Sequence, residues 1–168
     1  MNSNYLKRIK WIILFTSITG LFLSVILPTS GMGDAGRMYP DELRGSLYFV
    51  TGDIIVDITV TNGSLSFYVF DWQNSLEILE SQSLVDVTPV FAKENITTYS
   101  GVIEIPSAGF YSFLAMHYGD SSVSFRVDLT RVLPQKYILW PSFFILGAYI
   151  IIALIERNRL KLFADGIE

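Results

Sequence analysis

The stretch "SGVIEIPSAGFYSFLAMHYG", residues 100–119, decides the fold class, because it is nearly long and apolar enough to be taken for a membrane span. Pro106 and Gly109 interrupt it, and Glu104 and His117 would be costly inside lipid. Apolar and polar residues partly alternate on both sides of the interruption, as they do in half-buried strands. We therefore predict a hairpin of two strands joined by the turn "PSAG".

A second hairpin is predicted upstream of this stretch. Residues 53–60, "DIIVDITV", carry isoleucine or valine at every second position. Asn62-Gly63 follows, and this dipeptide accepts the positive φ angles that a two-residue hairpin turn needs. Residues 65–72, "LSFYVFDW", return as the second strand. Three more segments carry signals: strands over 46–50 and 122–132, and one or two helical turns over 74–81 with Ser75 as the N-cap.

The whole pattern predicts a mainly β chain, with an antiparallel β-sandwich of jelly-roll or GOLD-like type over residues 45–133. Roughly six to eight short strands, with turns about every 8–12 residues, are typical of sandwiches. The chain has no cysteine, so its hydrophobic core must hold this domain together without disulfides. Residues 28–44 are predicted to be a linker, because residues 31–41 hold three glycines and a proline without periodicity.

Two uncharged apolar runs flank the predicted sandwich, at residues 11–27 and 138–155, with 17 and 18 residues. They explain why 51% of all residues are hydrophobic and only 17% are charged. At about 1.5 Å per residue, each helix reaches roughly 26 Å, close to the hydrocarbon thickness of a bilayer. We predict transmembrane helices over 11–27 and 137–156 in a multi-pass protein of the cell membrane.

The first run has an alternative interpretation as a signal peptide. Lys7, Arg8 and Lys10 precede it like an n-region, and Thr29 and Gly31 supply small residues at the −3 and −1 positions of a cleavage site. A run of 17 apolar residues exceeds the usual h-region of about 7–15. We favour a retained helix and leave cleavage open.

Charge predicts the orientation. Basic residues near the helix ends favour cytoplasmic termini, at residues 1–10 and 157–168. Residues 28–136 carry 13 acidic and 6 basic side chains, a net charge of −7, and are expected to be extracytoplasmic. This acidic balance argues against nucleic-acid binding. Glycosylation sequons begin at Asn62 and Asn95, although Asn62 is also explained by its turn.

Small residues recur in the apolar runs. Thr16, Gly20 and Ser24 are four residues apart, and small residues let helices approach closely in lipid. Ser142 and Gly147 in the second run could offer a complementary surface. We predict helix packing through these five residues, either between the two helices of this chain or against another subunit.

The sequence predicts no catalytic site. His117 is the single histidine, no ligand cluster with metal spacing surrounds it, and no Gly-x-Ser-x-Gly motif exists. Asp53 and Asp57 would share a strand face about 13 Å apart, too far for paired acid–base chemistry. We expect no enzyme activity and no metal or cofactor.

One aromatic row is a candidate ligand or partner face. Tyr68, Phe70 and Trp72 occupy alternate positions of the predicted strand 65–72 and would share one side of it. Such a row can stack on sugars or bind a partner. The alternative is that it forms the second side of the sandwich core or contacts the membrane.

Residues 101–130, "GVIEIPSAGFYSFLAMHYGDSSVSFRVDLT", combine a strand ending in Ile-Pro, a glycine before an aromatic pair, a turn, and a last strand leading to an apolar run. This order resembles the end of GOLD-type β-sandwich domains of cargo receptors and of related archaeal and bacterial membrane proteins. The resemblance covers about residues 45–131 and implies a sandwich used for interaction. Cargo receptors usually carry a cysteine pair, a coiled coil and a single span, so their function is not carried over.

These features predict a non-catalytic accessory or structural subunit of a membrane protein complex. Its partners would be the lipid bilayer and other membrane subunits, with no nucleic acid, and its sandwich would mediate protein–protein contact. The alternatives are a cell-surface ligand- or glycan-binding module that uses Tyr68, Phe70 and Trp72, and a cargo-receptor-like protein.

Overall fold

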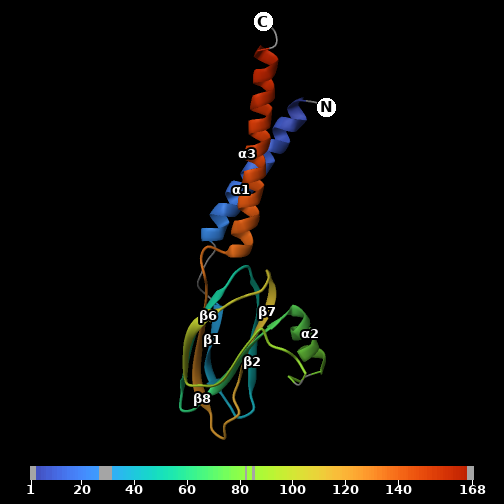
Figure 1. Cartoon of the computed structure of the whole chain (residues 1–168). Coiled ribbons are helices and arrows are strands. Elements are labelled where there is room, and N and C mark those ends of the chain that lie inside the picture. Colours follow the sequence, from blue (N-terminus) through green and yellow to red (C-terminus); the bar gives the residue numbers. More distant parts are fainter. Residues whose placement is uncertain (1–2, 27–31, 82, 85, 166–168) are drawn as a thin grey trace. The chain divides into compact units, whose positions relative to one another are not determined.

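A computed structural model describes residues 3–26, 32–81, 83–84 and 86–165 of the chain, which separate into two compact units (Figure 1). One unit holds the two long helices, α1 (Ser3–Ile26) and α3 (Lys136–Asp165). The other unit, Pro28–Gln135, holds the strands and the short helix α2 (Trp72–Ser81).

The strands of the described chain form two four-stranded antiparallel sheets, so the predicted β-sandwich is confirmed. Sheet A has the order β1-β8-β3-β6, and sheet B has the order β2-β7-β4-β5. The bounds in sheet A are β1 Met32–Met38, β8 Val123–Arg131, β3 Ile54–Thr61 and β6 Thr98–Ile103. The bounds in sheet B are β2 Leu43–Val50, β7 Gly109–Met116, β4 Leu65–Asp71 and β5 Phe91–Ile96.

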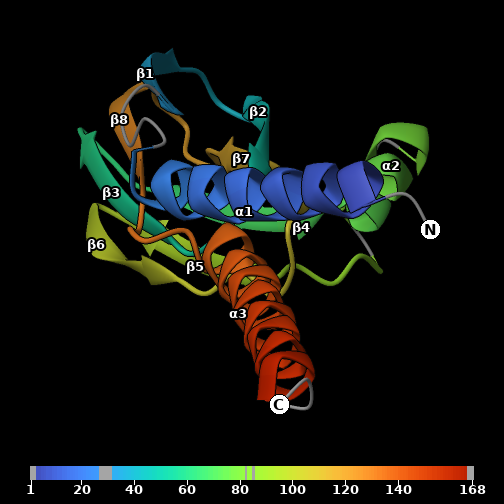
Figure 2. The same ribbon diagram turned by 90° about the horizontal axis from the view of Figure 1, so that it is seen from above.

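Successive strands alternate between the two sheets, except that β4 and β5 are neighbours in sheet B. This interleaved order of eight strands is the arrangement of a double-sheet jelly roll. Seen from above, the strands of sheet A lie on one side of the unit and those of sheet B on the other, with α2 beyond sheet B (Figure 2). Each sheet therefore has one face toward the other sheet and one outer face.

Both hairpins predicted from the sequence are wrong in their pairing. The Asn62-Gly63 turn leads from β3 in sheet A to β4 in sheet B, and residues 104–108 lead from β6 to β7 between the same two sheets. Asn62 and Gly63 do take positive φ angles, of 67° and 152°. The turn residues were thus identified correctly, but strand alternation predicts which face is buried and not which strand is the hydrogen-bonded neighbour.

The β6–β7 crossing is fixed by two side chains. Asp53 Oδ1 accepts a hydrogen bond from the backbone N–H of Ile105 at 2.9 Å. The hydroxyl of the buried Tyr111 donates to the carbonyl oxygen of Ser107 at 3.0 Å. These bonds satisfy backbone groups at the point where the chain leaves one sheet for the other.

The linker predicted over 28–44 is wrong where the structure describes it, because Met32–Met38 forms β1 and Leu43 begins β2. Strand β1 pairs with β8 from Met32↔Leu129 to Met38↔Val123. Gly33 has a φ of +150°, and a Cβ there would lie 2.3 Å from the carbonyl oxygen of Val127. Glycine is therefore required at this contact between β1 and β8. Backbone pairing at a sheet edge needs no side-chain periodicity, so the sequence pattern does not reveal this strand.

The core lies between the two sheets. Strand β8 alternates as predicted, with Val123, Phe125, Val127 and Leu129 buried and the residues between them on the outer face. Each fully buried side chain of this size contributes about 1.5–3 kcal/mol relative to an exposed one. The inward residues of sheet B come mainly from β4 and β7: Leu65, Phe67, Val69, Tyr111, Phe113 and Ala115.

Helix α2 begins two residues earlier than predicted, and Asp71 is its N-cap. The backbone N–H of Asn74 donates to Asp71 Oδ1 at 2.9 Å, which is the usual N-cap bond. The prediction of Ser75 as N-cap is wrong, because its hydroxyl donates to the Asp71 carbonyl at 2.5 Å from inside the helix.

In the helical unit, the segments Arg8–Ile26 and Lys136–Arg157 are long and apolar enough to cross a membrane, by length and composition alone. Only 11% and 6% of their apolar windows are buried, unlike the core helix of a soluble protein. Lys10 forms an ion pair with Glu156, and Gly20 lies against Ser142. Between these two contacts the residue number increases along α1, from 10 to 20, and decreases along α3, from 156 to 142, so the two helices are antiparallel. The cleavage alternative at residues 29–31 lies outside the described residues.

Candidate functional site

The outer faces of the two sheets have different chemistry. On sheet A, the outward residues of β8 and β3 are mostly polar, for example Arg126, Asp128 and Asp57, and Val102 of β6 is an exposed exception. On sheet B, the outward residues are mostly apolar. We call these residues the apolar face: Leu43, Leu47 and Phe49 of β2, Phe110, Leu114 and Met116 of β7, and Trp72, Leu76 and Leu79 of α2.

Strand register brings the apolar face together. Leu43 is opposite Met116, and Phe49 is opposite Phe110, with ring centroids 5.1 Å apart in an edge-on arrangement. Leu47 and Phe49 are 48% and 49% exposed, so the outward side chains of β2 are open to solvent in this chain. A Cβ on Gly45 would lie 2.2 Å from a methyl group of Leu114. Glycine at that position lets Leu114 lie across β2 and close the gap between the two rows.

A groove runs beside α2 on this face, with a volume of about 670 Å³. Helix α2 forms one wall, and Leu114 and Met116 of β7 form part of the floor. Leu79 stands at its rim and is 77% exposed. The residues around the groove carry no charge: Leu43, Ser75, Ile78, Leu79, Ser83, Leu84, Ser112, Leu114, Met116 and Tyr118.

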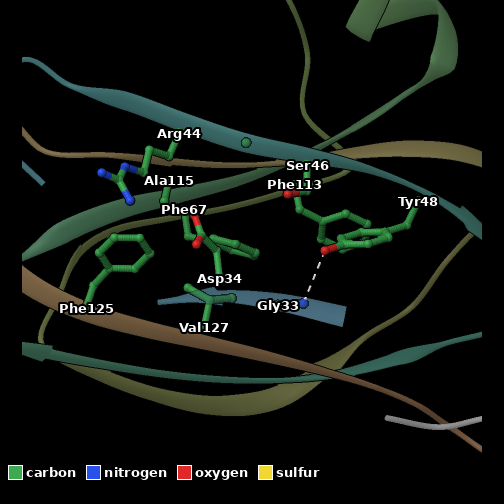
Figure 3. A pocket seen from close by; sticks show the side chains of 11 residues that line it. Gly33, Asp34, Arg44, Ser46, Tyr48, Phe67, Phe113, Ala115, Phe125 and Val127 are labelled. Atoms are coloured by element: carbon green, nitrogen blue, oxygen red, sulfur yellow. Dashed lines mark hydrogen bonds between the residues drawn. The ribbon is translucent and has the colours of Figure 1, made fainter. Parts of the chain in front are cut away.

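A second cavity, between the sheets beside the edge strands β1 and β2, is too small for a ligand (Figure 3). Its volume is about 20 Å³, which is room for roughly one water molecule. The backbone N–H of Gly33 donates to the Tyr48 hydroxyl at 3.2 Å across it. The Arg44 guanidinium lies 5.8 Å from the ring centroid of Phe125. We interpret it as a packing gap between edge strands.

Arg44 is also held by an ion pair at the start of β2. Its Nε donates to Glu42 Oε1 at 2.7 Å, while the other carboxylate oxygen accepts from the backbone N–H of Tyr39 at 2.7 Å. These two hydrogen bonds, first that from Arg44, lower the pKa of Glu42 below its ordinary value. The same bond raises the pKa of Arg44.

The aromatic row predicted as a ligand face does not exist as an exposed platform. Phe70 is only 1% exposed, and Trp72 belongs to α2, where its ring lies 5.8 Å from that of Phe110. The Tyr68 hydroxyl donates to Glu94 Oε1 at 3.0 Å, and burial together with this bond raises the pKa of Tyr68. The chain turns from strand to helix at Trp72, which ends the strand alternation on which the prediction depended.

Of the helix-packing residues predicted from the sequence, Gly20, Ser24 and Ser142 are on packed surfaces. A Cβ on Gly20 would lie 2.2 Å from Ser142 Oγ, and both serines are buried. Thr16 is exposed, and nothing lies within 4 Å of a Cβ on Gly147, so neither packs between the two helices of this chain. Their packing against another subunit stays a prediction.

Ser17 was missed by the sequence analysis and is fully buried, with its hydroxyl donating to the Ile13 carbonyl at 2.9 Å. Spacings of three and four residues, as in Ser17, Gly20 and Ser24, stay on one helix face. Strict spacing of four residues drifts around the helix, which explains why Thr16 does not face α3.

His117 is a structural residue that directly follows β7. It is buried, with Nδ1 2.8 Å from the carbonyl oxygen of Ser64 and Nε2 2.6 Å from that of Ser121. The ring thereby connects the β3–β4 turn to the β7–β8 turn. Within the described residues, no group of three acidic, histidine or cysteine side chains could hold a metal ion.

The two sequons lie at exposed bends of the sandwich. Asn62 and Asn95 both have positive φ angles, of 67° and 54°. Both side chains are exposed, and Asn95 lies near the end of β5. Their glycosylation stays a prediction.

No family model matches this chain, and no curated protein matches its sequence. Several solved structures are similar to it with low scores. PliG of Aeromonas hydrophila, a periplasmic inhibitor of g-type lysozyme, is 9% identical, with a TM-score of 0.41 over 61% of this chain and 86% of that chain. The pre-peptidase C-terminal domain of the Bacillus anthracis collagenase is 9% identical, with a TM-score of 0.42 over 60% of this chain and 90% of that one.

The Yersinia pseudotuberculosis-derived mitogen is 6% identical, with a TM-score of 0.41 over 60% of this chain and 85% of that one. The first two of these structures are folds of the β-sandwich type. At these identities and scores, the likeness carries no inference about the activity or partner of this chain. The predicted resemblance to GOLD-type domains stays a prediction.

Proposed function

We propose that this chain is a non-catalytic accessory subunit of a membrane protein complex. Helices α1 and α3 anchor it in the bilayer, and the apolar face of its β-sandwich binds a protein partner. The observation that carries this proposal is the exposed apolar face of sheet B, because soluble surfaces rarely leave a contiguous patch of this kind uncovered.

The membrane anchorage is supported by helix length and by the chemistry of the helix surfaces. The apolar segments of 19 and 22 residues reach about 29 and 33 Å as helices, enough to cross a hydrocarbon core. Large apolar side chains such as Phe15, Phe22 and Phe144 point outward on them. Since the helices are antiparallel, the proposal places both termini on one side of the membrane, which the basic ends make the cytoplasmic side. The sandwich is then extracytoplasmic.

The non-catalytic role is supported by the contacts of the titratable residues. The single histidine is held between two backbone carbonyl oxygens, which leaves no ring nitrogen to activate a nucleophile. The groove of about 670 Å³ on the apolar face is lined by uncharged side chains. Such a groove suits binding better than acid–base chemistry.

The proposal is tested by photo-crosslinking in native membranes. A photoreactive amino acid replaces Leu79 on the apolar face or, as a matched control, Thr59 on the outer face of sheet A. We expect a discrete protein adduct from position 79 and none from position 59. Adducts of equal yield from both positions, or lipid adducts alone from position 79, would contradict partner binding through sheet B.

We do not propose glycan binding through the aromatic row, because Phe70 is buried and Trp72 is on a helix. A cargo-receptor-like role shares the extracytoplasmic sandwich and the membrane anchor with our proposal. Crosslinking separates the two, because a subunit of a stable complex gives one dominant adduct and a cargo receptor gives several.

A further inference from the structure

We infer that Asn95 is a glycosylation site and that the first sugar attached to it packs over the cavity beside it. This inference rests on the extracytoplasmic location in the proposed function and adds a covalent carbohydrate to the sandwich. Three observations carry it: the bulge that holds Asn95, the cavity that Asn95 lines, and the difference between the two sequons.

A β-bulge sets the position of Asn95 on strand β5, at the edge of sheet B (Figure 2). The register of β4 against β5 shifts between Leu65 and Phe67. Two residues of β5, Glu94 and Asn95, therefore lie opposite Ser66 of β4. Bulges at sheet edges redirect a side chain out of the regular alternation. The Asn95 side chain is exposed there, with a φ of 54°.

A cavity of about 150 Å³ lies beside the bulge, and Asn95 lines it. The cavity forms where β4, β5 and the end of β7 meet, since Ser66 is also the partner of Met116 in β7. A single water molecule needs only about 10–15 Å³ of such space. The cavity therefore has room for part of a larger group.

The lining of this cavity suits a sugar. Ser64 and Ser66 contribute hydroxyl groups, which both donate and accept hydrogen bonds. Tyr118 contributes an aromatic ring that is 61% exposed and ends in a hydroxyl. Sugars present hydroxyl groups at their edges and C–H groups on their faces, so hydroxyls beside an open ring match both.

The sequon at Asn95 contains an exposed threonine that the bulge does not explain. Positive φ angles favour asparagine at position 95, but they set no requirement at Thr97. The fold uses the Thr97 backbone, whose carbonyl oxygen accepts from the N–H of Val60 at 2.8 Å, and buries the side chain of Ile96. The side chain of Thr97 is exposed, and its hydroxyl is the group that the acceptor motif requires.

The sequon at Asn62 is explained by its turn. Asn62 and Gly63 both have positive φ angles, and a Cβ on Gly63 would lie 2.5 Å from a methyl group of Val123. The third residue, Ser64, has its carbonyl oxygen 2.8 Å from His117 Nδ1. We therefore assign the sugar to Asn95 and interpret Asn62 as a turn residue.

The attachment is a glycosyl transfer that needs no oxidant or reductant. The side-chain amide nitrogen of Asn95 loses one proton and forms a bond with the anomeric carbon of the sugar. The donor is a lipid-linked sugar phosphate, and the bond between its anomeric carbon and the phosphate oxygen breaks. The phosphate leaves with the bonding electron pair and takes up the proton.

The product adjoins the binding surface of the proposed function. Met116 and Tyr118 line both this cavity and the groove on the apolar face. A sugar over the cavity is therefore next to the groove and limits how far a partner extends toward β5. It also places a bulky polar group at a sheet edge, where unpaired backbone groups favour association with other strands.

Mass spectrometry of the full chain, purified from its native membranes, tests the attachment. We expect the peptide that contains Asn95 to carry added sugar mass and the peptide that contains Asn62 to be unmodified. Thr97→Val should remove the added mass, whereas Thr97→Ser should keep it because serine also completes the motif. Asn62→Gln is the matched control and should change nothing. An unmodified Asn95, or equal modification of both sequons, would overturn the inference.

Thermal unfolding in detergent tests the placement of the sugar over the cavity. Thr97→Val removes the sugar without changing Asn95, and it should lower the unfolding midpoint. The decrease should be smaller when Tyr118→Ala is also present, because residues in contact are not additive. Phe49→Ala is the control, since Phe49 is at the other end of β2 from the partner of Met116. Equal decreases with and without the Tyr118 ring would overturn the placement.

A labelling experiment separates failure of this inference from failure of the proposed function. The chain has no cysteine, so Asp57→Cys introduces a single thiol on the exposed face of sheet A. A membrane-impermeant maleimide added outside should label it if the sandwich is extracytoplasmic. Labelling together with an unmodified Asn95 would overturn the glycosylation alone. Absence of labelling would contradict the extracytoplasmic location and with it both proposals.

Discussion

The outer faces of sheets A and B are built from strands of similar length, yet they differ in what they present to solvent. In sheet A, β8 alternates buried apolar and outward polar residues, as a sheet with one wet face does. In sheet B, β7 has Tyr111, Phe113 and Ala115 inward and Phe110, Leu114 and Met116 outward. A strand with apolar side chains on both faces is typical of a sheet that is covered on both faces. Helix α2 covers only part of the outer face of sheet B.

The largest expected effect separates the two sides of sheet B. Phe113→Ala removes a buried ring that packs 6.4 Å from Phe67, and it should lower the free energy of unfolding by about 3–5 kcal/mol. Phe49→Ala removes a half-exposed ring from the outer side and should cost less than about 1.5 kcal/mol. Urea unfolding of the full chain in detergent measures both. A similar cost for the two substitutions would mean that the outer side is already packed.

The second prediction concerns the apolar face against the outer face of sheet A. With the photoreactive amino acid placed at Leu47 of the same apolar face, Leu79→Asp should abolish capture of the partner, because a carboxylate at the groove rim must be desolvated on binding. The free energy of unfolding should change by less than about 0.5 kcal/mol, since Leu79 is largely exposed. Thr59→Asp on sheet A is the matched control and should leave capture intact. Retention of the partner by the Leu79 variant would locate its binding elsewhere.

The third prediction tests whether α2 is held at its start. Asp71→Ala removes the N-cap and should destabilise the sandwich by about 1 kcal/mol. Hydrogen exchange should rise first in residues 72–81, because the cap acts on the first turn of that helix. Ser75→Ala is the control and should have a smaller effect, since its hydroxyl bonds a carbonyl that the helix already uses. Equal exchange in the two variants would refute the assignment of Asp71 as the N-cap.

The smallest expected effect is the acid response of Glu42. Its pKa is lowered in the folded chain, so the pair with Arg44 stabilises the fold above the unfolded-state pKa of glutamate. That stabilisation is lost as the pH falls through the folded pKa. Glu42→Gln should therefore flatten the dependence of the urea midpoint on pH in the acidic range, measured from neutral pH downward. An unchanged slope would show that the pair does not contribute.

The sequence predicted the sandwich because core residues impose a period of two on the strands, as in β8. Pairing was not predictable in this way: Asn62-Gly63 encodes a turn, and the same backbone geometry serves a hairpin or a crossing between sheets. Strand β1 was hidden because its place depends on backbone bonds to β8 and on Gly33, not on apolar spacing. The packing of Gly20 and Ser142 could be predicted because both residues are small. The burial of Ser17 could have been predicted only from the angle of each residue around the helix, because a fixed spacing of four residues omits it.

The apolar face could have been found from sequence by one signal. Residues 110, 114 and 116 are apolar although residues 111, 113 and 115 already fill the inward positions of the same strand. When only composition is considered, these additional apolar residues are equally well explained by a membrane span or by a larger core. The contribution of α2 was not visible, because it depends on where the chain leaves the sheet at Trp72.

The pairing of β1 with β8 has a mechanical consequence. Met32 and Leu129 are partners, so the chain enters and leaves the sandwich at the same end of two neighbouring strands. Tension that separates α1 from α3 acts at that end of the β1–β8 pair. It therefore breaks the hydrogen bonds between β1 and β8 one residue pair at a time, instead of loading all of them at once in shear. We therefore expect β1 to peel away at low force while the other strands stay folded, a step that optical tweezers attached to the two helices would record as an early, short extension.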